Sequence, residues 1–119
     1  MQFDSMSPIW LQVMKLIEED IASGKKASGE KLPGGRDLAI SYSINPNTAA
    51  RVYQELEKKG LCETKRGMGT FVTADKGKIQ SLRAEMAETA IRQFVQKMAL
   101  LGFTPQAASE MILKEENEP

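Results

Sequence analysis

The segment Asn45-Pro46-Asn47-Thr48 has the residue types of a helix start that could contact a nucleic acid. An Asn side chain accepts a hydrogen bond from a free N–H at a helix start, and Pro suits the first helical position because it lacks an N–H. Asn47 and Thr48 would then lie in the first turn, where Asn can pair with adenine and Thr can contact a base. The unused N–H groups there would also favour a phosphate. The alternative is that Asn45 is only a cap and Asn47 an ordinary surface residue.

A second group of basic residues and glycines could bind the phosphate backbone of DNA. Arg51 follows one helical turn later and could reach a phosphate or a guanine. Lys65 and Arg66 precede Gly67 and Gly69 in a predicted hairpin tip, where glycines would let the backbone approach a groove and Arg66 could enter the minor groove. A solvated turn is the alternative. A nucleotide-binding phosphate loop is disfavoured because no Lys-Ser/Thr pair follows the glycines.

Arg36 is a further candidate, at the start of a short predicted helix. A positive charge at a helix N-terminus opposes the helix dipole, which disfavours a purely structural role, although Arg36 could pair with Asp37 or Glu63. The charge balance supports DNA binding only modestly, because residues 45–72 hold five basic groups and three acids. We therefore expect binding to need two copies of the domain and to weaken steeply with salt.

The elements that would position these residues can be recognised from their starts and their periodicity. Capping residues precede prolines at Ser7-Pro8, Asn45-Pro46 and Thr104-Pro105. Apolar spacing predicts helices over residues 8–23, 35–42 and 46–59. Two β-prone runs, residues 61–65 and 70–73, flank a Gly-x-Gly turn and predict a hairpin. Two short helices with a tight turn, followed by a hairpin, make a winged helix-turn-helix, so the predicted fold is mainly α with a small β-wing.

The apolar residues of these helices predict a core. The third helix is expected to bury Ala49, Val52, Tyr53 and Leu56. The first has an apolar stripe of Ile9, Val13, Leu16, Ile17 and Ile21, and most of the charged residues Lys15, Glu18, Glu19 and Asp20 lie off it. Trp10 is interpreted as a core or interface residue rather than a ligand clamp, and Cys62 as a small buried apolar residue.

The remaining chain predicts a two-helix tail. A helical pattern runs from residue 76 to about residue 101 and would be roughly 37 Å long, which is longer than so small a domain can cover alone. A last helix follows Thr104-Pro105. We therefore predict a DNA-binding domain over residues 8–75 and a dimerisation tail over residues 76–119. The expected dimer contacts are Leu82, Met86, Ile91, Phe94, Met98, Leu101 and Met111.

Composition narrows the function classes. The 119 residues carry 16 basic and 16 acidic side chains, so any basic patch must be local. No histidine is present, which removes the commonest metal ligand and general base; we expect no enzyme, metal site or cofactor. A single cysteine fits a reducing cytoplasm. No apolar run long enough for a membrane span occurs and residues 1–7 show no signal peptide, so we expect a cytoplasmic protein.

Taken together, several ordered motifs resemble the GntR family of bacterial transcription regulators. They are Pro8-Ile9-Trp10-Leu11-Gln12, Lys31-Leu32-Pro33-Gly34-Gly35-Arg36-Asp37-Leu38-Ala39, Asn45-Pro46-Asn47-Thr48, Tyr53-Gln54-Glu55-Leu56-Glu57, Gly60-Leu61 and Arg66-Gly67-Met68-Gly69-Thr70-Phe71-Val72. The resemblance covers about residues 8–74. The two-helix tail, interrupted by Leu101-Gly102-Phe103-Thr104-Pro105, is similar to the YtrA subfamily.

This resemblance implies a winged-helix repressor, often of a neighbouring transporter operon, that dimerises through its C-terminal helices. It also implies an inverted-repeat operator of the GT…AC kind, and it carries the DNA-contact roles to Arg36, residues 45–48, Arg51 and the wing. The chain is too short for the effector or aminotransferase-like domains of larger relatives, so no pyridoxal cofactor is expected. A small-molecule effector of unknown identity is a further possible partner. The alternative function is a winged-helix module that binds another protein instead of an operator.

Overall fold

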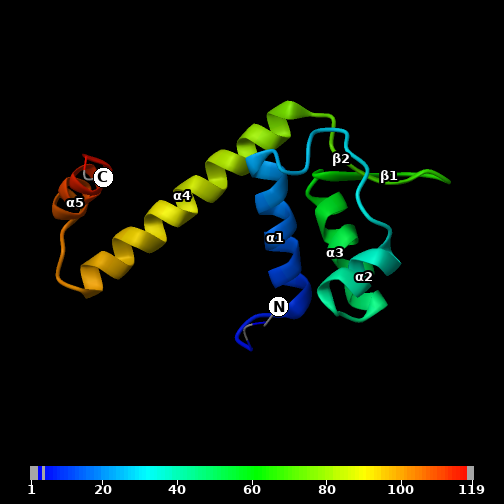
Figure 1. Ribbon diagram of the computed structural model, residues 1–119, viewed down its shortest axis with the longest axis horizontal. Helices are drawn as coiled ribbons and strands as arrows, with labels where there is room; N and C mark the ends of the chain where they lie inside the picture. Colours follow the sequence, from blue (N-terminus) through cyan, green and yellow to red (C-terminus); the bar gives the residue numbers. More distant parts are fainter. Residues whose placement is uncertain (1–2, 4, 118–119) are drawn as a thin grey trace. The chain divides into compact units, whose positions relative to one another are not determined.

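The computed structural model describes residue 3 and residues 5–117. The chain divides into two compact units, and the division falls between Arg83 and Ala84. The elements are α1 (Ile9–Ser23), α2 (Gly35–Tyr42), α3 (Pro46–Lys58), β1 (Cys62–Lys65), β2 (Gly69–Val72), α4 (Lys76–Leu100) and α5 (Pro105–Asn117) (Figure 1). This order confirms the predicted winged helix-turn-helix followed by two helices. The proposed boundary before Lys76 coincides with the start of α4, whereas the first turns of α4 are grouped with the first unit.

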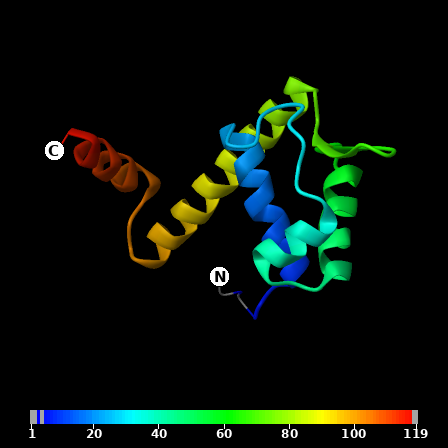
Figure 2. The same cartoon turned by 45° about the vertical axis from the view of Figure 1, so that its right-hand side comes forward.

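Helix α3 packs against both α1 and α2, and these three helices surround the core of the first unit (Figure 2). The residues predicted to be buried on α3 are buried: Ala49, Val52, Tyr53 and Leu56. On α1, the buried apolar residues are Val13, Met14, Ile17 and Ile21. Ile9 differs from the prediction because it remains 45% exposed. Burial of one face of α3 leaves its opposite face free for contacts outside the domain.

Two of the three predicted capping residues act as caps. The Asn45 Oδ1 atom accepts a hydrogen bond of 2.8 Å from the N–H of Asn47, with Pro46 at the first helical position. Thr104 Oγ1 accepts one of 3.1 Å from the N–H of Ala107. The prediction for Ser7 was wrong. Helix α1 begins one residue later than expected, so Pro8 occupies the N-cap position and forms no side-chain cap bond.

The hairpin forms in the predicted place and gains an unpredicted neighbour. Strands β1 and β2 are antiparallel, with Cys62 opposite Val72 and Lys65 opposite Gly69. Lys31, from the loop before α2, bridges to Phe71 on the other edge of β2. The loop is also held by a 2.8 Å hydrogen bond from the N–H of Leu32 to the carbonyl of Thr70. The wing is therefore joined to the segment that leads into α2.

Glu18 and Cys62 are buried groups that could otherwise ionise or react. Glu18, expected off the apolar stripe, is only 6% exposed, and its carboxylate pairs with the Lys59 ammonium at the end of α3. This ion pair joins α1 to α3. Cys62 is buried as expected, and burial, with a smaller contribution from Glu57, raises the pKa of its thiol to about 12. Cys62 therefore stays a neutral thiol at neutral pH.

Tyr53 links α3 to the segment that precedes α2. Its phenol donates a hydrogen bond to the carbonyl oxygen of Pro33, two residues before the start of α2. Burial raises the pKa of Tyr53 well above the usual value for a phenol, so the group remains a hydrogen-bond donor. The bond fixes the start of α2, and with it Arg36, relative to α3.

We predict that Tyr53→Phe lowers the free energy of unfolding by about 1 kcal/mol, because the Pro33 carbonyl loses its donor while the apolar packing is retained. Urea unfolding followed by circular dichroism measures this change. Tyr42→Phe is the matched control, because Tyr42 is half-buried and, among the described residues, makes no side-chain hydrogen bond. Equal stability of Tyr53→Phe and the wild type would show that the bond does not contribute.

Candidate nucleic-acid interface

The start of α3 presents the predicted base-reading residues together on one exposed surface. The tight turn before it passes through Ser43 in the left-handed conformation (φ 55°) and is closed by a 2.9 Å bond from the N–H of Ile44 to the carbonyl of Ala39. Asn45, Pro46 and Asn47 are then exposed. This turn is what allows the first turn of α3 to project from the domain.

The next turn of α3 adds two of the predicted contacts. Thr48 is half-buried, which leaves only part of its side chain available, while Arg51 is exposed. Arg51 follows Asn47 by four residues and therefore lies on the same side of the helix. Asn47, Thr48 and Arg51 thus offer an amide, a hydroxyl and a cation along about one turn. These are the groups that read base edges and bind phosphates when a helix enters the major groove.

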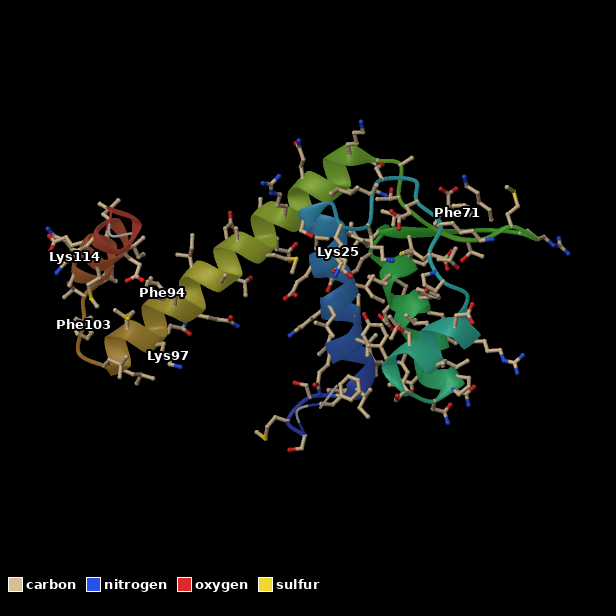
Figure 3. The ribbon with its side chains drawn as sticks, viewed as in Figure 1. Lys25, Phe71, Phe94, Lys97, Phe103 and Lys114 are labelled. Carbon is tan, nitrogen blue, oxygen red and sulfur yellow. The ribbon has the colours of Figure 1, made fainter. Side chains whose placement is uncertain are left out.

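The tip of the hairpin is the second exposed part of the interface. The exposed residues at the tip are Lys65, Arg66, Gly67 and Met68. The backbone of Gly67 has a φ of 75°, a conformation that residues other than glycine rarely adopt. The Lys65 Nζ atom lies 4.7 Å from the centre of the Phe71 ring, which is labelled on the hairpin in Figure 3. The wing therefore presents two cations on a narrow turn.

Gly69 has a positive φ that other residues rarely adopt, and the flexible Lys31 side chain lies beside it. Its φ is 120°, and a Cβ atom at this position would lie 2.9 Å from Cε of Lys31. The space beside Gly69 is thus filled by the Lys31 side chain. Lys31 is exposed and places a cation beside the wing that was not among the predicted DNA contacts. No spacing signal could have found it, because the contact depends on the bridge between Lys31 and Phe71.

Arg36 lies exposed in the first turn of α2. Within the part of the chain that the structure describes, neither Asp37 nor Glu63 forms an ion pair with it. Its guanidinium is therefore available to an outside partner. The hydrogen bond from Tyr53 to Pro33 holds the backbone just before it, so Arg36 is presented from a fixed helix end.

Trp10 makes a contact that the sequence did not predict. It lies half-buried at the start of α1, and the Arg51 Cζ atom lies 4.3 Å from the centre of its ring. The contact places an aromatic ring beneath one of the predicted DNA-binding cations.

Across the described residues, no cluster of acidic or cysteine side chains could hold a metal ion, and no helix is long and apolar enough to cross a membrane.

The second unit contains most of the residues that we expected at a dimer interface. Ile91 is 62% exposed and Phe94 40% exposed. Leu101 and Met111 are also exposed, whereas Met86 and Met98 are partly covered. An apolar groove on this unit is lined by Ile91, Phe94, Val95, Pro105, Ala108, Ser109, Ile112 and Leu113. Figure 3 labels Phe94 on α4 and Phe103 in the turn before α5.

Leu82 differs from the other members of that set in its burial. It is only 5% exposed in a single chain, because the first turns of α4 belong to the core of the first unit. The apolar stripe on α4 therefore has two uses. Its beginning completes the DNA-binding unit, and only its later residues are left exposed.

Comparison with known proteins agrees with this geometry. Residues 10–72 match the family described as "Bacterial regulatory proteins, gntR family". The chain is 36% identical to the HTH-type transcriptional regulator YhcF of Bacillus subtilis, over 93% of this chain and 92% of that protein. It is 33% identical to the HTH-type transcriptional repressor YtrA of the same organism, over 73% of this chain and 72% of that protein.

Solved structures show the same relationship. A GntR family transcriptional regulator from Listeria monocytogenes superposes with a TM-score of 0.86 at 33% identity, covering 94% of this chain and 98% of that chain. The DNA-binding domain of AraR, in complex with operator ORX1, superposes with a TM-score of 0.56 at 26% identity, covering 61% of this chain and 93% of that chain. With its winged helix and its family match over more than half of its length, this chain belongs to the GntR family of bacterial transcriptional regulators.

Proposed function

We propose that this chain is a homodimeric transcriptional repressor that binds an inverted-repeat operator. The main support is that the exposed Asn47 amide and Arg51 guanidinium, with the half-buried Thr48 hydroxyl between them, occur together with an exposed basic wing on one small unit. Helix α3 would read bases in the major groove, while Arg36 and the wing would position the protein on phosphates. Repression follows from the similarity to YtrA, which is named a repressor. As a bacterial regulator of DNA, the protein would act in the cytoplasm.

The proposed contacts divide by chemistry. Asn47 and Thr48 would supply base readout, Asn45 and Pro46 would set the helix start, and Arg51 would reach a phosphate or a guanine. Lys65, Arg66, Gly67 and Gly69 would form the wing contact, with Lys31 beside them. Because no strong net charge assists binding, two copies are needed for useful affinity. A transporter operon as the target and an effector as the inducer are suggested only by the family resemblance.

The second copy would cover the apolar surface of the later part of α4 and of α5. Monomeric proteins rarely expose large contiguous apolar patches, and such patches mark interaction sites. The large exposed apolar residues of the second unit are Ile91, Phe94, Leu100, Leu101, Phe103, Met111, Ile112 and Leu113. A two-fold dimer would bury the same surface of both copies, and it would match the symmetry of an inverted-repeat operator. We accordingly propose residues 76–119 as the dimerisation region and residues 8–75 as the DNA-binding region.

We predict that Phe94→Glu combined with Met98→Glu gives a monomer, because two carboxylates cannot be buried at an apolar interface without large cost. Light scattering after gel filtration measures the mass. The monomer should bind an operator at least tenfold more weakly, because the second half-site no longer contributes. Gln93→Glu combined with Gln96→Glu, at exposed positions of the same helix, adds equal charge and should leave the dimer intact. A dimeric mass for the Phe94/Met98 variant would contradict the proposed interface.

The DNA-binding function is tested by selection from a pool of random duplex DNA at about 150 mM salt. We expect enrichment of a two-fold symmetric site by the wild type and loss of that enrichment in Arg51→Ala combined with Arg66→Ala. Lys15→Ala combined with Lys97→Ala removes the same charge from outside α3 and the hairpin and should retain the site. If a folded dimer enriches no sequence, the operator-binding proposal fails and a protein-interaction role for the winged helix gains support.

A further inference from the structure

The contact between Trp10 and Arg51 joins the first turn of α1 to the second turn of α3. The Arg51 Cζ atom lies 4.3 Å from the centre of the indole ring, well within the range of a cation–π interaction. Near the other end of the same two helices, Glu18 pairs with Lys59. The first contact joins the beginnings of the two helices, and the second joins residues later in each. The two helices therefore run side by side in the same direction (Figure 1). Trp10 therefore lies beside the DNA-facing end of α3.

Trp10 is less buried than the residues that fill the core between these helices. The fully buried residues of α1 and α3 include Val13, Ile21, Val52 and Leu56, whereas Trp10 is only half-buried. The Arg51 guanidinium lies over one face of its ring. The contact thus lies at the surface, next to the proposed base-reading residues, and not in the interior.

Arg51 has no competing partner that would explain its position. In the described ranges, residue 3 and residues 5–117, no carboxylate forms an ion pair with it. A guanidinium that lies over an aromatic face keeps its N–H groups available around its edge. Those N–H groups can still bind two oxygens at once, on a phosphate or on a guanine.

We propose that Trp10 is a positioning residue for operator binding: its ring holds the Arg51 guanidinium beside the start of α3 in a conformation ready to bind DNA. This inference rests on the proposed function. A free arginine side chain loses much rotational freedom when it binds a phosphate, and that loss weakens binding. Because Arg51 already contacts Trp10 in the unbound protein, its side chain has less rotational freedom left to lose when it binds DNA. Trp10 itself need not touch the DNA.

A double-mutant cycle tests this role. Wild type, Trp10→Leu, Arg51→Ala and the combined variant are compared for binding to the labelled duplex enriched by the wild type, followed by fluorescence anisotropy. Trp10→Leu should weaken binding about threefold, the size expected for an exposed cation–π contact. In the Arg51→Ala background, Trp10→Leu should have no further effect, because Trp10 acts only through Arg51. Trp10→Tyr, which keeps an aromatic ring, should restore most of the affinity.

Two matched controls separate this role from general effects. Ile9→Ala shortens the apolar residue next to Trp10 and should leave affinity unchanged. Lys58→Ala removes one positive charge from α3, two turns after Arg51, where the lysine pairs only with Glu55 among the described residues. Its effect on affinity should be smaller than that of Arg51→Ala and should not depend on Trp10.

A spectroscopic readout does not depend on DNA or on the stability of the Trp10 variants. Trp10 is the one tryptophan of the chain, so its fluorescence reports directly on the contact. Arg51→Ala should change the emission intensity or wavelength, and Lys58→Ala should not. Identical emission from wild type and Arg51→Ala would overturn the inference.

The outcomes also distinguish the inference from the function on which it rests. If the wild type binds the duplex and the effects of Trp10→Leu and Arg51→Ala simply add, the inference fails while the proposed function stands. If the wild type selects and binds no duplex, the proposed function fails and the inference fails with it. Non-additive effects, together with the change in emission, support both.

Discussion

The burial of one face of α3 is the constraint on which the rest of this structure depends. Ala49, Val52, Tyr53 and Leu56 can leave water only if α1 and α2 pack against them. Burying several such side chains is the main favourable term available to so small a unit. The same packing determines which face of α3 looks outward. Asn47 and Arg51 are exposed because their neighbours on the helix are buried.

Aromatic side chains lie against two of the exposed cations. Trp10 of α1 lies under Arg51 of α3, and Phe71 of β2 lies under Lys65 of β1. Tyr53 holds the backbone before Arg36 by its bond to Pro33. A cation that is held in place loses less freedom on binding a phosphate than a free one. On the proposed function, these contacts would favour DNA binding even though the chain has no net positive charge.

Local signals in the sequence were sufficient to predict most elements of the fold. Asn45 and Thr104 were recognised as caps because capping depends on residues two or three positions away. Ser7 failed as a cap because a shift of one residue in the start of α1 placed Pro8 at that position. The hairpin and the buried face of α3 followed from turn residues and from spacing.

What the sequence could not predict depends on contacts between distant segments. Glu18 looked like a surface carboxylate until Lys59, far along the chain, was seen beside it. Lys31 lies beside the wing only through its bridge to Phe71, and Trp10 contacts Arg51 only because α1 packs along α3. Leu82 fitted the apolar stripe of α4 equally well as a core residue or an interface residue, and only the folded unit distinguishes the two.

The proposed function requires that two copies of the α3 surface and the wing read one symmetric site. Hydroxyl-radical footprinting of the wild-type dimer on the duplex that it selects tests this most directly. We predict two protected segments related by two-fold symmetry, with their centres about one helical turn of DNA, or a multiple of it, apart. A single protected segment without symmetry, at protein concentrations where the dimer persists, would contradict the account.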